Sequence, residues 1–235
     1  MNMAAPEISQ PFIGLTLGLI AVTGVAFVRL LPYRRATAAL MAMLAWLAMQ
    51  GILAGKGFFE TPHSFPPRMG LIVIPMLAFL VWVARGKLPL TFAEACPGRY
   101  LVWFQAFRIL VEVTIYKLAQ AGLMPREMTF EGRNFDIISG VSAVAMGFVA
   151  NKSSVWALKS IISWNLVCAA ILCVTVVTGV LSAPGPQRML MTPIPNRAVL
   201  LFPFVYIPAF MVPLAFSLHI LSVQKSLAML KKKSD

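Results

Sequence analysis

Five polar side chains recur at every third or fourth position of one otherwise apolar stretch, residues 101–123. They are Gln105, Arg108, Glu112, Tyr116 and Gln120. In an α-helix this spacing places all five on one face. A face that combines a carboxylate, a guanidinium and neutral hydrogen-bonding groups can bind a proton, a cation or an anionic group. It can equally hold neighbouring helices together.

The charges of this stripe lie deep within the apolar stretch, with Glu112 near its middle. A charge at the centre of a bilayer costs about 2.5–3.5 kcal/mol even on insertion-based scales, so Arg108 and Glu112 must face protein or water. Being four residues apart, they can form an ion pair that is purely structural. Alternatively, Glu112 is a proton or cation site in a hydrated cavity, where Arg108 influences its ionisation or holds an anionic group. The residues alone leave both interpretations open.

Other apolar stretches carry single polar side chains that could line the same cavity. Tyr206 is included in the candidate site with the stripe. The remaining groups are weaker, because one polar residue in a membrane helix more often bonds a neighbouring helix. They are Gln50, Asn165, Thr175, Ser217 and His219.

The loops on the side where the stripe ends are rich in charge and predict an outer vestibule. Its candidate residues are Arg68, Arg126, Arg133, Asn134 and Asp136, joined by Glu60, His63, Arg188 and Arg197. The arginines could attract an anionic substrate, or they could meet lipid phosphates. For Asn134 and Asp136 the simpler interpretation is capping of the helix that follows, because this role needs no ligand.

The amino-acid composition indicates whether these polar groups lie in a soluble protein or in a membrane protein. The chain has 235 residues, of which 59% are hydrophobic and 12% charged, and its mean hydropathy is +0.82. A soluble enzyme or a disordered tail needs far more charge, so this composition indicates an integral membrane protein. We therefore read the net charge of +12 as a topology signal and expect no nucleic-acid partner.

The predicted fold is all-α, a single transmembrane domain over residues 1–235. Apolar stretches long enough to cross roughly 30 Å of hydrocarbon as helices predict seven spans. They cover residues 12–31, 37–54, 70–84, 101–123, 135–151, 161–182 and 198–224. The third and fifth are short, so their ends are the least defined.

The basic residues in the loops predict the orientation of these spans. Loops on one side carry Arg29, Arg34, Arg35, Arg85, Lys87, Arg99, Lys152, Lys159, Lys225, Lys231, Lys232 and Lys233. The other side carries half as many: Lys56, Arg68, Arg126, Arg133, Arg188 and Arg197. Because basic loops stay in the cytoplasm, we expect the N-terminus outside and the C-terminus inside an inner or plasma membrane.

Small residues and prolines predict how the spans pack. Gly14 and Gly18 in the first span, and Ser139, Ala143 and Gly147 in the fifth, form faces on which another helix can lie close. Pro203, Pro208 and Pro213 each remove an amide donor from the seventh span. We expect that span to be bent or locally unwound, as at a hinge.

These features favour transport or binding of a small solute or ion over other functions. A sensor, receptor or assembly subunit is the main alternative, and a lipid-modifying membrane enzyme is a weaker one. No metal-ligand spacing or cofactor motif is present in the sequence, so we expect neither a metal nor a cofactor. The expected partners are the lipid bilayer and a small solute, ion or lipid, and the oligomeric state is open.

Overall fold

The computed structural model describes residues 5–61 and 64–234, and this part of the chain is all-α, without a β-strand. Its α-helices are α1 (Pro6–Leu30), α2 (Tyr33–Gly55), α3 (Gly70–Arg85), α4 (Lys87–Ala95), α5 (Gly98–Trp103), α6 (Phe107–Gln120), α7 (Asp136–Val149), α8 (Val155–Ser182) and α9 (Val212–Ser234). Short 3₁₀ segments are η1 (Phe104–Ala106), η2 (Arg126–Met128) and η3 (Ala198–Leu200), and η4 (Ile207–Met211) is a π-helix.

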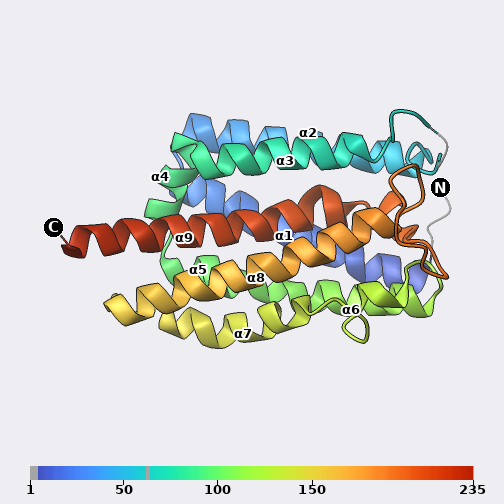
Figure 1. The fold of residues 1–235 in the computed structure, drawn as a ribbon. Helices are drawn as coiled ribbons and strands as arrows, with labels where there is room; N and C mark the ends of the chain where they lie inside the picture. Colours follow the sequence, from blue (N-terminus) through green and yellow to red (C-terminus); the bar gives the residue numbers. More distant parts are fainter. Residues whose placement is uncertain (1–4, 62–63, 235) are drawn as a thin grey trace.

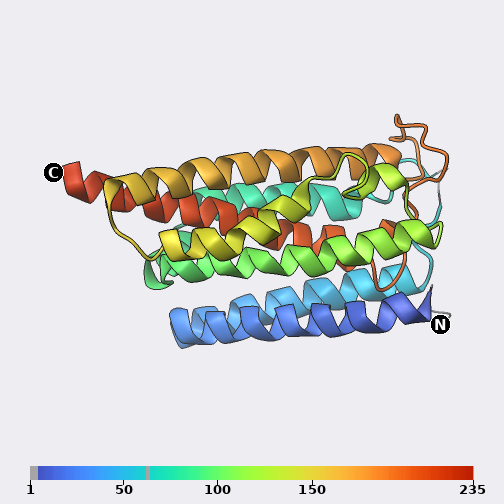
Figure 2. The ribbon, with the colours of Figure 1, turned by 90° about the horizontal axis from the view of Figure 1, so that it is seen from below.

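The helices run roughly along one axis, and α9 lies in the middle of the bundle (Figure 1). It packs against α8, α3, α4 and α5. The hairpin of α1 and α2 lies along one side of the other helices (Figure 2). Helix α1 begins at one end of the bundle, and α9 ends at the other (Figure 1).

Each predicted span is largely helical, but the lengths of the helices differ. Helices α1, α2, α8 and the segment Ile207–Lys233 are long and apolar enough to cross a membrane. Helices α3 and α4 meet the same test only together, and they are bent by 64° relative to each other. Helix α7 has only 14 residues. Helices α5 and α6 follow one another directly, separated by the 3₁₀ segment η1. Several helices are therefore suited to a membrane.

The seventh predicted span is irregular at its start, which confirms the expectation drawn from its prolines. Residues 201–205 form a bend and a turn, and the π-helix η4 leads into α9. Pro213 has no amide to donate to the carbonyl of Ala209, four residues earlier. That carbonyl instead accepts a 2.9 Å hydrogen bond from the indole nitrogen of Trp46 on α2. The irregular turn is thus fixed by a neighbouring helix.

The small residues of α7 form a close helix contact, as predicted. Ser139, Ala143 and Gly147 are buried, and a Cβ atom at Gly147 would meet the indole of Trp103. The same expectation is wrong for Gly14 and Gly18. Both are exposed, and a Cβ atom on either would meet no atom within 4 Å. The reason is that this face of α1 points away from the bundle.

Candidate functional site

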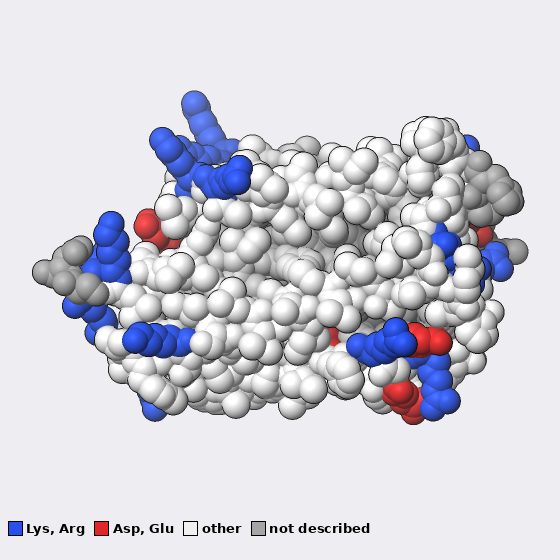
Figure 3. Space-filling model, in the orientation of Figure 1, with Lys and Arg blue, Asp and Glu red and all other residues white. Residues whose placement is uncertain are grey.

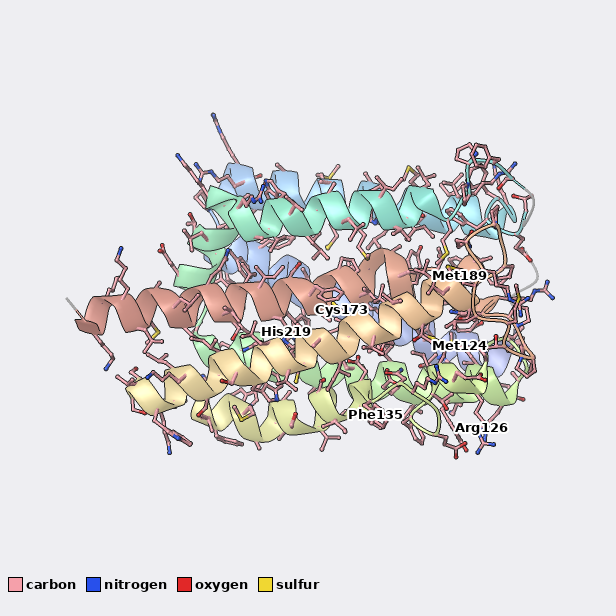
Figure 4. The ribbon with its side chains drawn as sticks, viewed as in Figure 1. Met124, Arg126, Phe135, Cys173, Met189 and His219 are labelled. Atoms are coloured by element: carbon pink, nitrogen blue, oxygen red, sulfur yellow. The ribbon has the colours of Figure 1, made fainter. Side chains whose placement is uncertain are left out.

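Helix α7 begins inside the bundle rather than at its end. Asn134, just before α7, contacts Glu112 on α6. Glu112 lies eight residues before Gln120, the last residue of α6, and eight residues of helix rise about 12 Å. Figure 4 agrees, since Arg126 lies at the end of the bundle and Phe135 nearer its middle. The segment 121–135 therefore returns into the bundle, where irregular backbone is tolerated only beside protein or water.

Asn134 connects three elements through its side-chain amide. Its Nδ2 donates to Oε1 and Oε2 of Glu112, at 2.9 and 2.8 Å, and to the carbonyl of Met128, at 3.0 Å. Its Oδ1 accepts from the hydroxyl of Thr175 on α8, at 2.8 Å, and from the amide of Asp136, at 3.0 Å. By accepting the first amide of α7, Asn134 plays the capping role that the sequence favoured.

Arg108 forms the second part of the site, together with Asp136 and His219. Its guanidinium makes an ion pair with Asp136, in which Nε donates to Oδ2 at 2.7 Å. Its Nη1 lies 2.8 Å from Nε2 of His219, and a guanidinium can only donate, so Nε2 is the acceptor. The Nδ1 of His219 then carries the hydrogen and donates to Oδ1 of Asn165, at 2.8 Å. His219 is therefore neutral in this arrangement.

These contacts join seven side chains of α6, α7, α8, α9 and the segment before α7, which we call the polar cluster. Its members are Arg108, Glu112, Asn134, Asp136, Asn165, Thr175 and His219. All are buried, and the label of His219 in Figure 4 lies between the ribbons of α8 and α9. A network of this size inside an apolar bundle is fixed by its own hydrogen bonds.

The ion pair between Arg108 and Glu112, one of the two interpretations that the sequence left open, is not formed. Among the described residues, Arg108 pairs with Asp136 from another helix, and Glu112 accepts only from Asn134. The physical reason is the position of α7, whose first turn brings Asp136 to the guanidinium. The charges of Arg108 and Asp136 compensate each other, so Glu112 has no cationic partner in the cluster.

A cavity of about 70 Å³ lies between α3, α6, α8 and η4, next to the polar cluster. Its polar lining residues are Glu112, Asp136, Thr175 and Asn196. The rest of its lining is aliphatic or methionine: Met69, Ile72, Val73, Met76, Val111, Ile115, Met124, Met128, Leu172, Val176, Gly179, Val180, Val199, Ile207, Pro208 and Val212. Asn196 donates to the carbonyl of Gly179, at 3.2 Å. Its buried Oδ1 has no hydrogen-bond partner among the described residues.

The predicted stripe separates into an inner and an outer part. Gln105 is fully buried and donates to the carbonyl of Ala215 on α9, at 3.1 Å. Tyr116 is half-buried and stacks on Phe130, whereas Gln120 is exposed. Of the five stripe residues, only Glu112 lines the cavity.

Tyr206 also lies elsewhere than predicted. Its hydroxyl donates to the carbonyl of Leu47 on α2, at 3.3 Å, and it is not among the residues that line the cavity. Arg108 is also not among the residues that line the cavity, because it lies behind Asp136 within the cluster. A ligand role for these residues stays a prediction, and their contacts are those of helix packing.

The predicted vestibule divides in a similar way. Arg68 donates to the carbonyl of Phe58, Arg126 forms a 3.0 Å ion pair with Glu131, and Arg133 is exposed. Asn134 and Asp136 belong instead to the buried cluster. Glu60 and Arg197 lie 3.9 Å apart at the surface, Arg188 donates to the carbonyl of Thr192, and His63 lies outside the described residues. Four of these arginines thus have separate partners, and the fifth, Arg133, is exposed, so they do not form one site.

Three members of the cluster were only weak candidates in the sequence, and Asn196 was missed. Asn165, Thr175 and His219 are single polar residues in apolar stretches. They are recognised as members of the cluster only by their hydrogen bonds in the folded structure. Asn196 follows a proline-rich loop, and no local signal distinguishes it from a surface residue. Its position at the cavity depends on the path of residues 183–197 across the end of the bundle. In that loop, the backbone amide of Asn196 donates to the carbonyl of Ser182, at 2.9 Å.

These features define a class of protein: a helical bundle suited to a membrane, with a charged cluster buried where a short helix begins. The chain belongs to the family described as domain of unknown function (DUF8737), whose model matches residues 68–225. The matched region includes the whole polar cluster and Asn196, but not the hairpin of α1 and α2. No curated protein matches the chain, and no solved structure does.

Proposed function

We propose that the chain is a membrane protein with seven spans, its N-terminus outside and its C-terminus in the cytoplasm. The spans are α1, α2, α3 with α4, α5 with α6, α7 with the segment before it, α8, and η4 with α9. The charge distribution supports this orientation. Lys and Arg dominate the end at which α9 terminates, and the opposite end mixes both signs (Figure 3). A broad band with little charge separates the two ends, as a bilayer requires.

Within this bundle, the cavity beside Glu112 binds a small solute or ion and provides its route across the membrane. The observation that carries this proposal is the charge balance of the polar cluster. Arg108 compensates Asp136, and His219 is held neutral, so Glu112 is the one carboxylate of the cluster without a cation. A lone buried carboxylate is costly unless it binds a proton or another cation. Glu112 lines the cavity, where such an exchange can occur.

Two structural features next to the cavity support movement of a ligand. The π-helix η4 contributes Ile207 and Pro208 to the cavity lining, and π-helical turns are frequent at functional sites. The short helix α7 begins within the bundle, beside the polar cluster. Short helices that begin within the membrane form ion and substrate sites in many transporters.

The test is a flux measurement with purified protein in liposomes that contain a pH-sensitive dye. A potassium gradient with valinomycin drives protons inward. We expect a proton flux that Glu112→Gln reduces to the level of protein-free liposomes, because the amide cannot exchange a proton. Glu131→Gln, which alters an exposed carboxylate, should leave the flux unchanged. Wild-type flux in Glu112→Gln, or no flux in the wild type, would contradict proton transport through this cavity.

A sensor or receptor that uses the same cavity without moving its ligand is the second candidate. It predicts ligand binding that depends on Glu112 in the absence of flux. The lipid-modifying enzyme has less support, because the arginines of the outer loops do not gather at one point.

A further inference from the structure

The hydrogen-bonding groups that line the cavity restrict what it can bind. Thr175 donates its hydroxyl to Oδ1 of Asn134, and Asn196 donates one of its two N–H groups to the carbonyl of Gly179. The carboxylate of Asp136 is paired with Arg108. The acceptors left for a ligand are the carboxylate of Glu112 and the buried Oδ1 of Asn196, which has no hydrogen-bond partner among the described residues. A ligand that donates hydrogen bonds therefore fits this cavity best.

Both acceptors belong to residues that line the same small cavity of about 70 Å³. Asn134 and Glu112 lie beside Thr175, and Asn196 lies beside Gly179, one helical turn further along α8. An ammonium group has several N–H donors and can therefore serve more than one acceptor of the lining. Its positive charge compensates Glu112.

The remaining lining favours an aliphatic body over a bare metal ion. Four methionines line the cavity, Met69, Met76, Met124 and Met128, together with valine, isoleucine and leucine side chains. A hard metal cation needs a shell of about six oxygen ligands, and this apolar lining does not supply one. Its volume of about 70 Å³ has room for a ligand of roughly five water-sized groups.

The lining also excludes one kind of organic cation. Quaternary ammonium groups have no N–H donor and are recognised by the faces of aromatic rings. None of the lining residues is aromatic. The cavity therefore fits an ammonium ion that retains its N–H groups.

We propose that the cavity binds a small primary aliphatic ammonium ion, which donates to Glu112 and Asn196 and packs its alkyl chain against the methionines and valines. This inference rests on the proposed function, since it names the ligand class of the same site. It explains why a carboxylate and an unpartnered amide oxygen occur together in an otherwise apolar cavity.

The test is calorimetric titration of the full chain in detergent micelles at neutral pH, with n-propylammonium chloride as the probe. Three controls are titrated in the same way. Sodium chloride supplies a cation without an alkyl chain, and tetramethylammonium chloride supplies an organic cation without N–H groups. n-Propanol supplies the same alkyl chain without a charge. We expect binding of n-propylammonium alone. Equal binding of tetramethylammonium, sodium or propanol would overturn the proposal.

Variants identify where the probe binds. Glu112→Gln should weaken n-propylammonium binding at least 100-fold, and Asn196→Ala about tenfold, as expected for loss of a hydrogen bond to a charged group. Gln50→Leu, which changes a buried amide of α2 outside the cavity, should bind as the wild type does. If Asn196→Ala does not fold, Val176→Phe tests the same cavity, since it should exclude propylammonium and still admit methylammonium. Unchanged affinity in Glu112→Gln would overturn the proposal.

The outcomes separate this inference from the proposed function. Glu112-dependent proton flux without n-propylammonium binding would overturn the ligand class and leave the transport proposal intact. Binding that depends on Glu112, with flux of neither protons nor n-propylammonium into the liposomes, would support the ligand class and contradict transport.

Discussion

Asp136→Ala is expected to lower the free energy of unfolding by about 3–5 kcal/mol, because it leaves the charge of Arg108 buried without a partner. The guanidinium is 2% exposed, and Asp136 is its one carboxylate partner among the described residues. Water cannot replace the lost carboxylate at this depth. The measurement is equilibrium unfolding in mixed micelles, followed by circular dichroism.

A matched control and a rescue make this prediction specific. Glu131→Gln breaks the exposed ion pair with Arg126 and should change the same quantity by less than about 1 kcal/mol. Adding Arg108→Met to Asp136→Ala removes the unpaired charge and should restore much of the lost stability. If Asp136→Ala is no more harmful than Glu131→Gln, the two ends of this ion pair are not buried together.

Asn134→Asp is expected to lower the free energy of unfolding by about 3 kcal/mol at neutral pH, because it sets a second carboxylate against Glu112. The substitution keeps the size of the side chain and the acceptor for Thr175 and the amide of Asp136. It removes the donor that now contacts both oxygens of Glu112. Two facing carboxylates favour uptake of a proton by the folded protein. The folded state then binds more protons than the unfolded chain, so the stability of this variant should rise as the pH falls.

Exchanging the two groups tests the contact itself. In the double variant Glu112→Gln with Asn134→Asp, the amide at 112 can donate to the carboxylate at 134. We expect stability at neutral pH to recover in part, and the added dependence on pH to disappear. Unfolding measured against pH for the wild type, both single variants and the double variant gives the coupling energy. A coupling near zero would mean that residues 112 and 134 do not touch.

The elements that hydropathy and periodicity predict are those that depend on local sequence. The apolar stretches are helical in the structure, and the buried part of the stripe, from Gln105 to Glu112, follows from its spacing of three and four. The irregular start of the seventh span follows from Pro208 and Pro213, which cannot donate an amide wherever they lie. In each case the cause is contained within one turn of helix or one apolar stretch.

The partners within the site could not be predicted in this way. Arg108 and Asp136 are 28 residues apart, and their contact depends on where α7 begins inside the bundle. The segment from Pro125 to Asp136 is dense in charge, which indicates an exposed loop, whereas Asn134 lies against Glu112. The sequence therefore offered Asn134 and Asp136 as capping or vestibule residues, and Arg108 as one possible partner of Glu112. Only the tertiary arrangement shows which carboxylate remains without a cation.

Proton exchange at the cavity requires that the carboxyl group of Glu112 bind and release a proton. Difference infrared spectra between low and high pH, recorded for the wild type and for Glu112→Gln, test this directly. We predict a protonated carboxyl band in the wild type that titrates, shifts in heavy water and is absent from Glu112→Gln. Identical difference spectra for the two proteins would contradict a proton site at Glu112, because this residue would then neither bind nor release a proton.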